Sequence, residues 1–241
     1  MAARPKYGID APGVIRNLLL AGAASVVLGL VLPPVLHLGA STVQLRPTAF
    51  SIGVSVAFGG ALMLLYALVG KFHHRDRMLD LHPWRGDEQV LDIGTGRGLL
   101  LVSAARRIPT GHATGIDIWN REDLSGNALD RTERNLALEG VADRCTLLNE
   151  AVQTMSFPDN SFDVVLSNLC LHNIDDQATR RHACTEIARV LKPGGVAILS
   201  DYKLTGEYAH ALRSSGLKVE RKFPNLLTTF PPLRILIARK S

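Results

Sequence analysis

The residues best suited to chemistry in this 241-residue chain lie around a glycine-rich turn. Residues 90–98 read VLDIGTGRG, in which an acid follows two apolar residues and glycines then alternate with other residues. Glycine allows a tight backbone turn and lets a ligand lie against the backbone without a side chain in the way. The turn predicts a small-molecule binding site formed by Asp92, Gly94, Thr95, Gly96 and Gly98.

A second acid ends the next apolar stretch. Asp117 lies 19 residues after Gly98, and an acid at the carboxyl end of a strand can accept hydrogen bonds from both hydroxyls of a ribose. Ile118 follows and offers apolar surface to a purine. Dinucleotide-binding enzymes use the same arrangement, but the sixth place of their fingerprint is glycine and here it is Leu99.

Three further motifs follow along the chain. Two of them lead into the fourth expected strand and the third comes after it. They are Asn-Glu-Ala at 149–151, FPDNSFD at 157–163 and RVLKPGG at 189–195. With the glycine turn, these motifs resemble those of class I S-adenosylmethionine-dependent methyltransferases. Within that class the chain is most similar to the branch that contains ubiquinone/menaquinone and sterol methyltransferases.

The resemblance implies that S-adenosylmethionine is the cofactor. It implies that Glu150 binds the exocyclic amine of adenine and that Ala151 contributes backbone contacts. Asn168 ends the fourth strand, where ligands bind in open α/β sheets, and we group it with the cofactor-binding residues. His172 occupies the position at which the family often has a histidine on the acceptor side, where either proton removal or a packing role fits it.

From residue 73 onward, apolar strand patterns alternate with helical ones. The expected strands are Gln89–Ile93, His112–Asp117, Cys145–Leu148, Phe162–Ser167, Val196–Ser200, Leu217–Lys222 and Leu233–Ala238. The expected helices are Gly98–Arg107, Asp123–Glu139, Gln177–Leu191 and Glu207–Ser214. This order predicts an α/β fold with a Rossmann-like, mostly parallel seven-stranded sheet whose last strand is antiparallel.

The first part of the chain differs in character. Residues 14–38 and 48–70 are almost wholly apolar, and the second stretch has 23 residues without a charge. Since roughly 20 apolar residues cross the hydrocarbon layer, both are expected to be transmembrane helices. We therefore expect a membrane anchor over residues 1–72 and a methyltransferase domain over 73–241.

Two other interpretations of these stretches are a cleaved signal peptide, for the first, and a buried soluble hairpin. Small residues at Ser51, Ser55 and Gly59 recur every four positions and would let another helix approach closely.

Charge sets the expected topology. Basic residues flank the hairpin at both outer ends, whereas its connecting loop contains Arg46 as the sole basic residue. The positive-inside rule then places both ends, and the catalytic domain, in the cytoplasm of a multi-pass membrane protein. The basic residues from Lys71 to Arg77 are expected to contact membrane lipids.

The expected acceptor is a lipophilic small molecule, such as a lipid, a quinone or other isoprenoid, or a hydrophobic thiol. Nucleic acid is not expected as a partner, because the chain lacks a basic stretch interleaved with aromatic residues. No metal-ligand spacing occurs, and the three cysteines form no CxxC pair. The sequence does not specify an oligomeric state.

Three alternative functions remain open at this stage. A tethered methyltransferase could act on a water-soluble molecule. A catalytically silent S-adenosylmethionine-binding scaffold is a second possibility, against which the intact Asp92 and Asp117 argue. A nicotinamide-dependent oxidoreductase is the third, and the early third glycine and the LKPGG turn argue against it.

Overall fold

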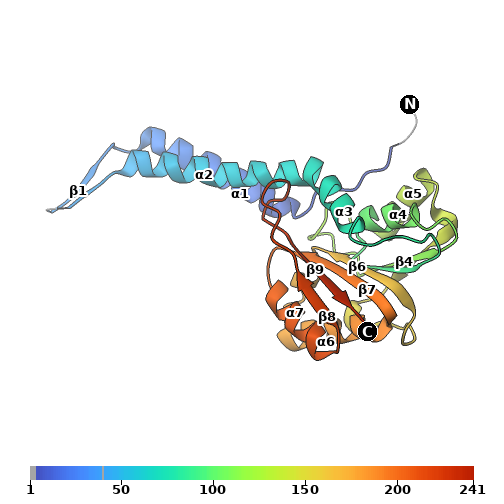
Figure 1. Ribbon diagram of the computed structural model, residues 1–241. Coiled ribbons are helices and arrows are strands. Elements are labelled where there is room, and N and C mark those ends of the chain that lie inside the picture. Colours follow the sequence, from blue (N-terminus) through green and yellow to red (C-terminus); the bar gives the residue numbers. More distant parts are fainter. Residues whose placement is uncertain (1–3, 40) are drawn as a thin grey trace.

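A computed structural model describes residues 4–39 and 41–241. Residues 1–3 and 40 belong to the expected anchor and lie outside the described residues. The chain has two parts, a long helical hairpin and an α/β domain at one end of it (Figure 1).

Two long helices form the hairpin. They are α1 (Pro12–Val31) and α2 (Leu45–Leu65), connected by the short antiparallel strands β1 (Leu36–Leu38) and β2 (Ser41–Val43). The first helix ends at Val31, before the expected end at residue 38. Pro33 and Pro34 disfavour helical backbone in the residues before them, and Leu32 is already extended.

The second helix extends beyond the expected 48–70 at both ends. It begins at Leu45 and continues through a π-helical turn, η1 (Tyr66–Gly70), directly into α3 (Lys71–Leu79). The expected domain boundary at 72/73 therefore falls inside a continuous helix.

Glycines bring α1 and α2 into close contact. A Cβ on Gly22 would lie 2.7 Å from Ala57, and one on Gly53 would lie 2.8 Å from a side-chain carbon of Val26. The expected stripe of Ser51, Ser55 and Gly59 is not the face that meets α1, since both serines are exposed.

Both hairpin helices are long and apolar enough to cross a membrane, and the second candidate span runs from Leu45 to Leu79. About a fifth of each apolar window is buried, 17% and 22% respectively. Large apolar side chains point outward along both helices, including Leu20, Val27 and Phe58.

The α/β domain is built on a seven-stranded sheet with the order β5-β4-β3-β6-β7-β9-β8. The strands are β3 (Gln89–Ile93), β4 (His112–Asp117), β5 (Cys145–Asn149), β6 (Phe162–Asn168), β7 (Leu191–Asp201), β8 (Lys218–Arg221) and β9 (Arg234–Arg239). The five strands β5, β4, β3, β6 and β7 are parallel to one another. β9 runs antiparallel to both of its neighbours, β7 and β8. The expected topology is confirmed.

Helices cover both faces of this sheet. The helices α4 (Leu99–Ala105) and α5 (Leu129–Leu138) lie with α3 on one face, and α6 (Gln177–Val190) and α7 (Thr205–Ser214) on the other. Short 3-10 turns occur at η2 (Ala142–Arg144), η3 (Val152–Thr154) and η4 (Leu171–Asn173). Separate apolar clusters fill the two faces, so the carboxyl ends of the parallel strands remain available for a site.

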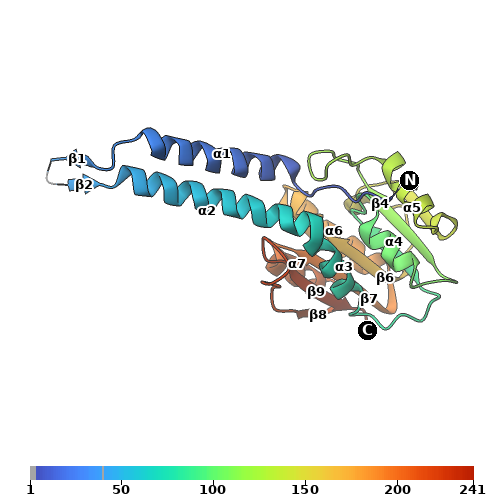
Figure 2. The same cartoon turned by 90° about the horizontal axis from the view of Figure 1, so that it is seen from above.

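The helix expected from Asp123 begins only at Leu129. Residues before it form a loop that pairs with the N-terminal segment, which we define as residues 4–11. The Ile9 amide donates to Ser125 Oγ at 2.7 Å, and the Ala11 amide donates to the Asp123 carbonyl at 2.9 Å. The N-terminal segment, expected to be part of the anchor, thus runs across the α/β domain toward α5 (Figure 2).

Candidate active site

Asp92 shapes the glycine turn from beneath. Its Oδ2 accepts hydrogen bonds from Thr95 Oγ1 at 2.8 Å and from the Leu101 amide at 3.0 Å. Complete burial raises the pKa of Asp92 to about 7, against the lowering effect of these two bonds. The side chains of Asp92 and Thr95 are therefore turned toward each other, and they fix the path of the loop.

Three glycines in this turn have left-handed backbone. Gly94, Gly96 and Gly98 have φ values of 69°, 54° and 81°, which disfavour other residues. A Cβ on Gly94 would also lie 2.6 Å from the Cβ of Cys170. Cys170 thus packs on the glycine turn, and burial raises the pKa of its thiol above the ordinary range, as for a small apolar side chain rather than a nucleophile.

Asp117 lies at the end of β4, where its carboxylate faces the glycine turn. Oδ2 accepts from the Gly96 amide at 2.7 Å, while Oδ1 accepts from the Trp119 amide at 2.6 Å and from Asn127 Nδ2 at 3.3 Å. The carboxylate is thereby held in one orientation, with acceptor capacity left for a ligand hydroxyl.

Asn127 is a site residue that sequence reasoning missed. Its Oδ1 is buried beside Asp117 and has no hydrogen-bond partner. A buried unpaired acceptor costs about 1–3 kcal/mol unless a ligand supplies a donor. A ribose hydroxyl would supply one here, so the residues around Asp117 fit the ribose of the expected cofactor.

The expected adenine contacts follow the ends of two adjacent strands. Asp117 of β4 pairs in register with Asn149 of β5, which brings Ile118 and Glu150 to neighbouring positions. Ile118 is 63% exposed, as a platform for a purine requires. The Glu150 carboxylate accepts from the Ser156 hydroxyl and amide at 2.6 and 3.1 Å, and Ala151 starts a turn beside it.

The residues expected on the acceptor side lie at the ends of β6 and β7. Asn168 pairs in register with Ser200, and its side-chain Oδ1 is buried without a partner. His172 follows on η4, with Nδ1 located 2.8 Å from Oδ1 of Asp201 at an angle outside hydrogen-bond geometry. Its ring packs edge-on against Tyr202, with centroids 4.8 Å apart.

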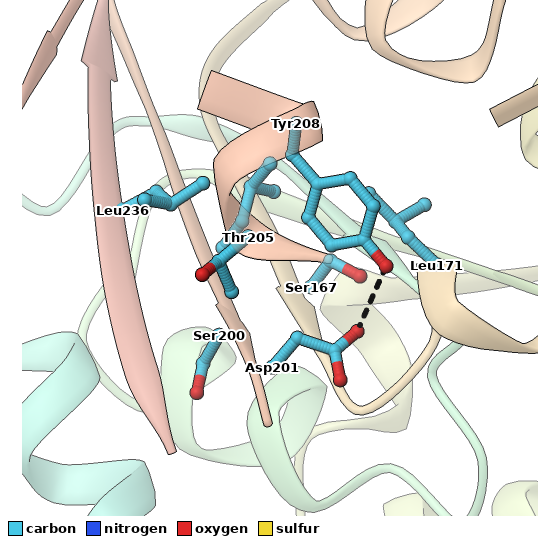
Figure 3. A pocket seen from close by; sticks show the side chains of 8 residues that line it. Ser167, Leu171, Ser200, Asp201, Thr205, Tyr208 and Leu236 are labelled. Atoms are coloured by element: carbon cyan, nitrogen blue, oxygen red, sulfur yellow. Dashed lines mark hydrogen bonds between the residues drawn. The ribbon is translucent and has the colours of Figure 1, made fainter. Parts of the chain in front are cut away.

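Asp201 connects this side to a small pocket between β6, β7 and α7. Figure 3 shows the hydroxyl of Tyr208 pointing to the Asp201 carboxylate, at 3.4 Å. Ser167, Leu171 and Thr205 line the same pocket. Nothing in the sequence pattern singled out Asp201, although it is the last residue of β7, the fifth parallel strand in the order of the chain.

The hairpin contributes side chains to this edge of the sheet. His74 of α3 is buried, with Nε2 2.7 Å from Ser200 Oγ and Nδ1 unpartnered. Tyr66 of η1 is also buried, and its hydroxyl lies beside the side chain of Asn168. Neither position could be predicted from the sequence, because both residues lie far from the motifs along the chain.

Among the residues that the structure describes, no group of three or more His, Cys, Asp or Glu side chains could hold a metal ion. The polar groups at the carboxyl ends of the parallel strands form two sets, one around Asp117 and one around Asn168.

Residues 90–195 match the family model of a methyltransferase domain. The chain therefore contains a class I S-adenosylmethionine-dependent methyltransferase domain, with S-adenosylmethionine as its cofactor. The match covers the glycine turn, Asp117 and the strand that ends at Asn168.

Curated relatives agree with the family model. An uncharacterized methyltransferase of Mycobacterium bovis is 34% identical over 122 residues, which cover 51% of this chain and 54% of that protein. Demethylmenaquinone methyltransferase of Symbiobacterium thermophilum is 34% identical over 123 residues, covering 51% and 45% respectively. The chain spans about half the length of the curated relatives it matches.

Among solved structures, an O-methyltransferase family protein from Burkholderia thailandensis is similar in fold. Its TM-score is 0.61 at 17% identity, over 94% of this chain and 70% of that one.

Proposed function

We propose that this protein is a membrane-anchored methyltransferase that transfers the methyl group of S-adenosylmethionine to a lipophilic small molecule. The hairpin would cross the bilayer, and the catalytic domain would lie at its cytoplasmic surface. The observation that carries the proposal is the position of Tyr66 and His74, which extend from the apolar hairpin to the ends of β6 and β7.

The exposure of the hairpin supports the membrane assignment. A core helix of a soluble protein is mostly buried, whereas large apolar side chains here face outward along two helices of 20 and 21 residues. A 20-residue helix is about 30 Å long, which matches the hydrocarbon layer. In a polar solvent such a surface would drive aggregation.

The path of the chain supports a cytoplasmic catalytic domain. Both outer ends of the hairpin meet the α/β domain, so a single side of the membrane would hold them both (Figure 2). Lys71 binds the carbonyls of Tyr7 and Gly8 at 3.0 and 2.5 Å, joining the two ends. The basic residues around this junction are those that the positive-inside rule places in the cytoplasm.

An apolar loop beside the hairpin supports a lipophilic acceptor. The loop between β8 and β9, dark red in Figure 1, reaches up to the hairpin. Phe230 lies 3.9 Å from where a Cβ on Gly59 of α2 would be, and the Thr228 carbonyl contacts Gly70. Leu227 on the same loop is 96% exposed. At a bilayer surface this side chain would enter the lipid and open a route from the membrane to the site.

In this reaction the protein has two tasks, to position the acceptor and, where needed, to remove its proton. When bound, S-adenosylmethionine supplies a methyl group on a positively charged sulfur, which leaves as a neutral thioether with the electron pair of the broken C–S bond. The protein holds the acceptor atom in line with that bond, so that the lone pair of the acceptor forms the new bond to carbon. Where the acceptor carries a proton, His172 would take it, and the nearby Asp201 carboxylate would stabilise the resulting imidazolium.

Partition of the labelled product tests this function. Membranes that contain the full chain would receive methyl-labelled S-adenosylmethionine and then be separated into organic, protein and aqueous fractions. We expect label in the organic fraction, and none from membranes that contain Asp117→Ala. Label confined to the aqueous fraction would establish a water-soluble acceptor instead, and label in no fraction would favour a silent cofactor-binding protein.

A further inference from the structure

We propose that Lys71, at the base of the hairpin, is a positioning residue for cofactor binding. It would act through the N-terminal segment, which it holds against the loop that follows Asp117. The hairpin would then help to set the affinity for S-adenosylmethionine. This inference uses the cofactor identified above, and it holds whether or not the hairpin crosses a bilayer.

Lys71 is buried where the hairpin meets the α/β domain, with 4% of its side chain exposed. Its Nζ donates to the carbonyls of Tyr7 and Gly8 at 3.0 and 2.5 Å and lies 3.5 Å from Oδ2 of Asp10. These three acceptors can use all three protons of the ammonium group. Lys71 is therefore not part of the basic surface expected to contact lipids, because its charge is directed into the N-terminal segment.

The N-terminal segment pairs with the loop of residues 118–127, which we call the Asp117 loop. The Ile9 amide donates to Ser125 Oγ at 2.7 Å, and the Ser125 amide donates to the Ile9 carbonyl at 3.0 Å. The two stretches run antiparallel at this point. The position of the Asp117 loop thus depends on the position of the N-terminal segment.

Leu124 of the same loop transmits this contact to the glycine turn. A Cβ on Gly8 would lie 3.0 Å from Cδ1 of Leu124, and a Cβ on Gly96 would lie 2.9 Å from its Cδ2. Leu124 therefore packs between the N-terminal segment and the glycine turn. The Gly96 amide in turn donates to Asp117 at 2.7 Å, so a displaced segment would disturb the residues that face the cofactor.

Asn135 of α5 provides a second link between the segment and the glycine turn. Its buried side chain accepts from the Lys6 amide at 3.0 Å and donates to the Lys6 carbonyl at 3.0 Å and the Arg97 carbonyl at 2.8 Å. Arg97 lies between the second and third glycines of the turn. The segment is thus bonded to the hairpin on one side and to the cofactor turn on the other.

This arrangement affects binding because the Asp117 loop ends at Asn127, which donates to the Asp117 carboxylate at 3.3 Å. A loop that is held in place before the cofactor arrives avoids an ordering cost on binding. If the segment is released, only a fraction of the molecules has the loop in place, and the apparent affinity falls by that fraction.

Lys71→Met tests the proposal, because methionine keeps an apolar stem and removes the amine. The full chain in detergent would be titrated with S-adenosylhomocysteine by calorimetry, and we expect about tenfold weaker binding than for wild type. Hydrogen exchange should become faster at the Ile9 and Ser125 amides and stay unchanged in β7. Loss of stability with unchanged affinity would show that Lys71 is merely structural and would overturn the proposal.

Lys192→Met is the matched control. Lys192 also pairs with a carboxylate, with Nζ 2.8 Å from Oδ2 of Asp163, but this pair lies near the amino ends of β6 and β7. The variant should keep the wild-type affinity and the wild-type exchange at Ile9. An equal loss of affinity in both lysine variants would overturn a specific role for Lys71.

A double variant tests whether Lys71 acts through the segment. Ser125→Ala removes one of the two hydrogen bonds to Ile9 and should weaken binding by about threefold. Combined with Lys71→Met it should add no further loss, because the segment has already been released. Additive losses would show that Lys71 acts by another route.

Should Lys71→Met fail to fold, Asp10→Asn takes its place, since it removes only the charged partner of Lys71. Weaker binding that is not additive with Ser125→Ala would support the proposal. Unchanged binding in both Asp10→Asn and Ser125→Ala would overturn it.

Discussion

The two halves of the site differ in how their buried polar atoms are satisfied. On the cofactor side, Asp92 and Asp117 accept hydrogen bonds from their own loops, and Asn127 Oδ1 is left to face a ribose hydroxyl. At the ends of β6 and β7, His74 and His172 each retain a buried ring nitrogen without a hydrogen bond. The carboxylates of the first half are thus held by several hydrogen bonds from their own loops, whereas the imidazoles of the second half are held by fewer.

This difference reflects what each half must recognise. A cofactor of constant structure can be bound by a loop whose shape is set by internal hydrogen bonds. The polar groups at the ends of β6 and β7 come from α3 and η1 as well as from the sheet, and under the proposed function they would face the acceptor. The expected results below are arranged to separate the two halves.

The largest effect is expected from Asp117→Ala. The change removes the carboxylate that faces the ribose and leaves the Gly96 amide unpaired. Affinity for S-adenosylhomocysteine should fall about 1000-fold, as measured by calorimetry. Insertion of the hairpin into membranes should not change, and unaltered cofactor affinity would show that the ribose assignment is wrong.

Asp92→Asn tests whether internal hydrogen bonds, rather than charge, shape the turn. Burial raises the pKa of Asp92 to about 7 from an unfolded value near 4, so the folded state binds this proton more tightly. The contribution of Asp92 to stability therefore falls as the pH rises from about 4 through about 7.

The asparagine oxygen can accept both existing bonds and carries no charge. Against wild type, Asp92→Asn should be equally stable at pH 4 and about 4 kcal/mol more stable at pH 8. Thermal unfolding of the full chain in detergent at both pH values measures this. A constant difference across the range would contradict the raised pKa.

Gly94→Ala tests the contact that joins the two halves. The added Cβ would meet the side chain of Cys170, and the φ of 69° would add strain. We expect the free energy of unfolding to fall by about 2 kcal/mol. The double variant with Cys170→Gly should recover part of this loss relative to Gly94→Ala, and a purely additive result would show that the contact is unimportant.

The smallest effect is expected from Leu227→Ser on the acceptor side. Because Leu227 is 96% exposed, unfolding should change by less than about 0.5 kcal/mol. Labelling of a membrane-borne acceptor should fall about threefold, since the loop loses apolar contact with lipid. Equal labelling by variant and wild type would remove this loop from the acceptor route.

The cofactor half could be predicted from the sequence because its residues lie on consecutive strands with a fixed order. Asp92, Gly94 and Asp117 lie at strand ends, and parallel strands bring such ends to one edge of a sheet. The helix expected from Asp123 was wrong for a related reason. Its first residues bond to the N-terminal segment, a contact that local propensity does not encode.

The acceptor half was only partly predictable. His172 and Asn168 could be found from the motif at the end of β6, but not the unpaired state of their polar atoms. His74 and Tyr66 required the contacts of α3 with β7 and of η1 with β6, which join residues separated by more than 100 positions in sequence. Asp201 could be found only from its position next to His172 and Tyr208. The small-residue stripe of Ser51, Ser55 and Gly59 is not the face of α2 that packs on α1, because periodicity identifies a face without saying which neighbour covers it.

By itself, the sequence determined the sheet topology, the cofactor turn and two apolar helices, because each depends on patterns local to the chain. Tertiary structure decided which side of α2 packs on α1, where the N-terminal segment lies and which polar atoms remain unpaired. Those outcomes depend on contacts between distant segments, such as the one that places His74 of α3 against Ser200 of β7.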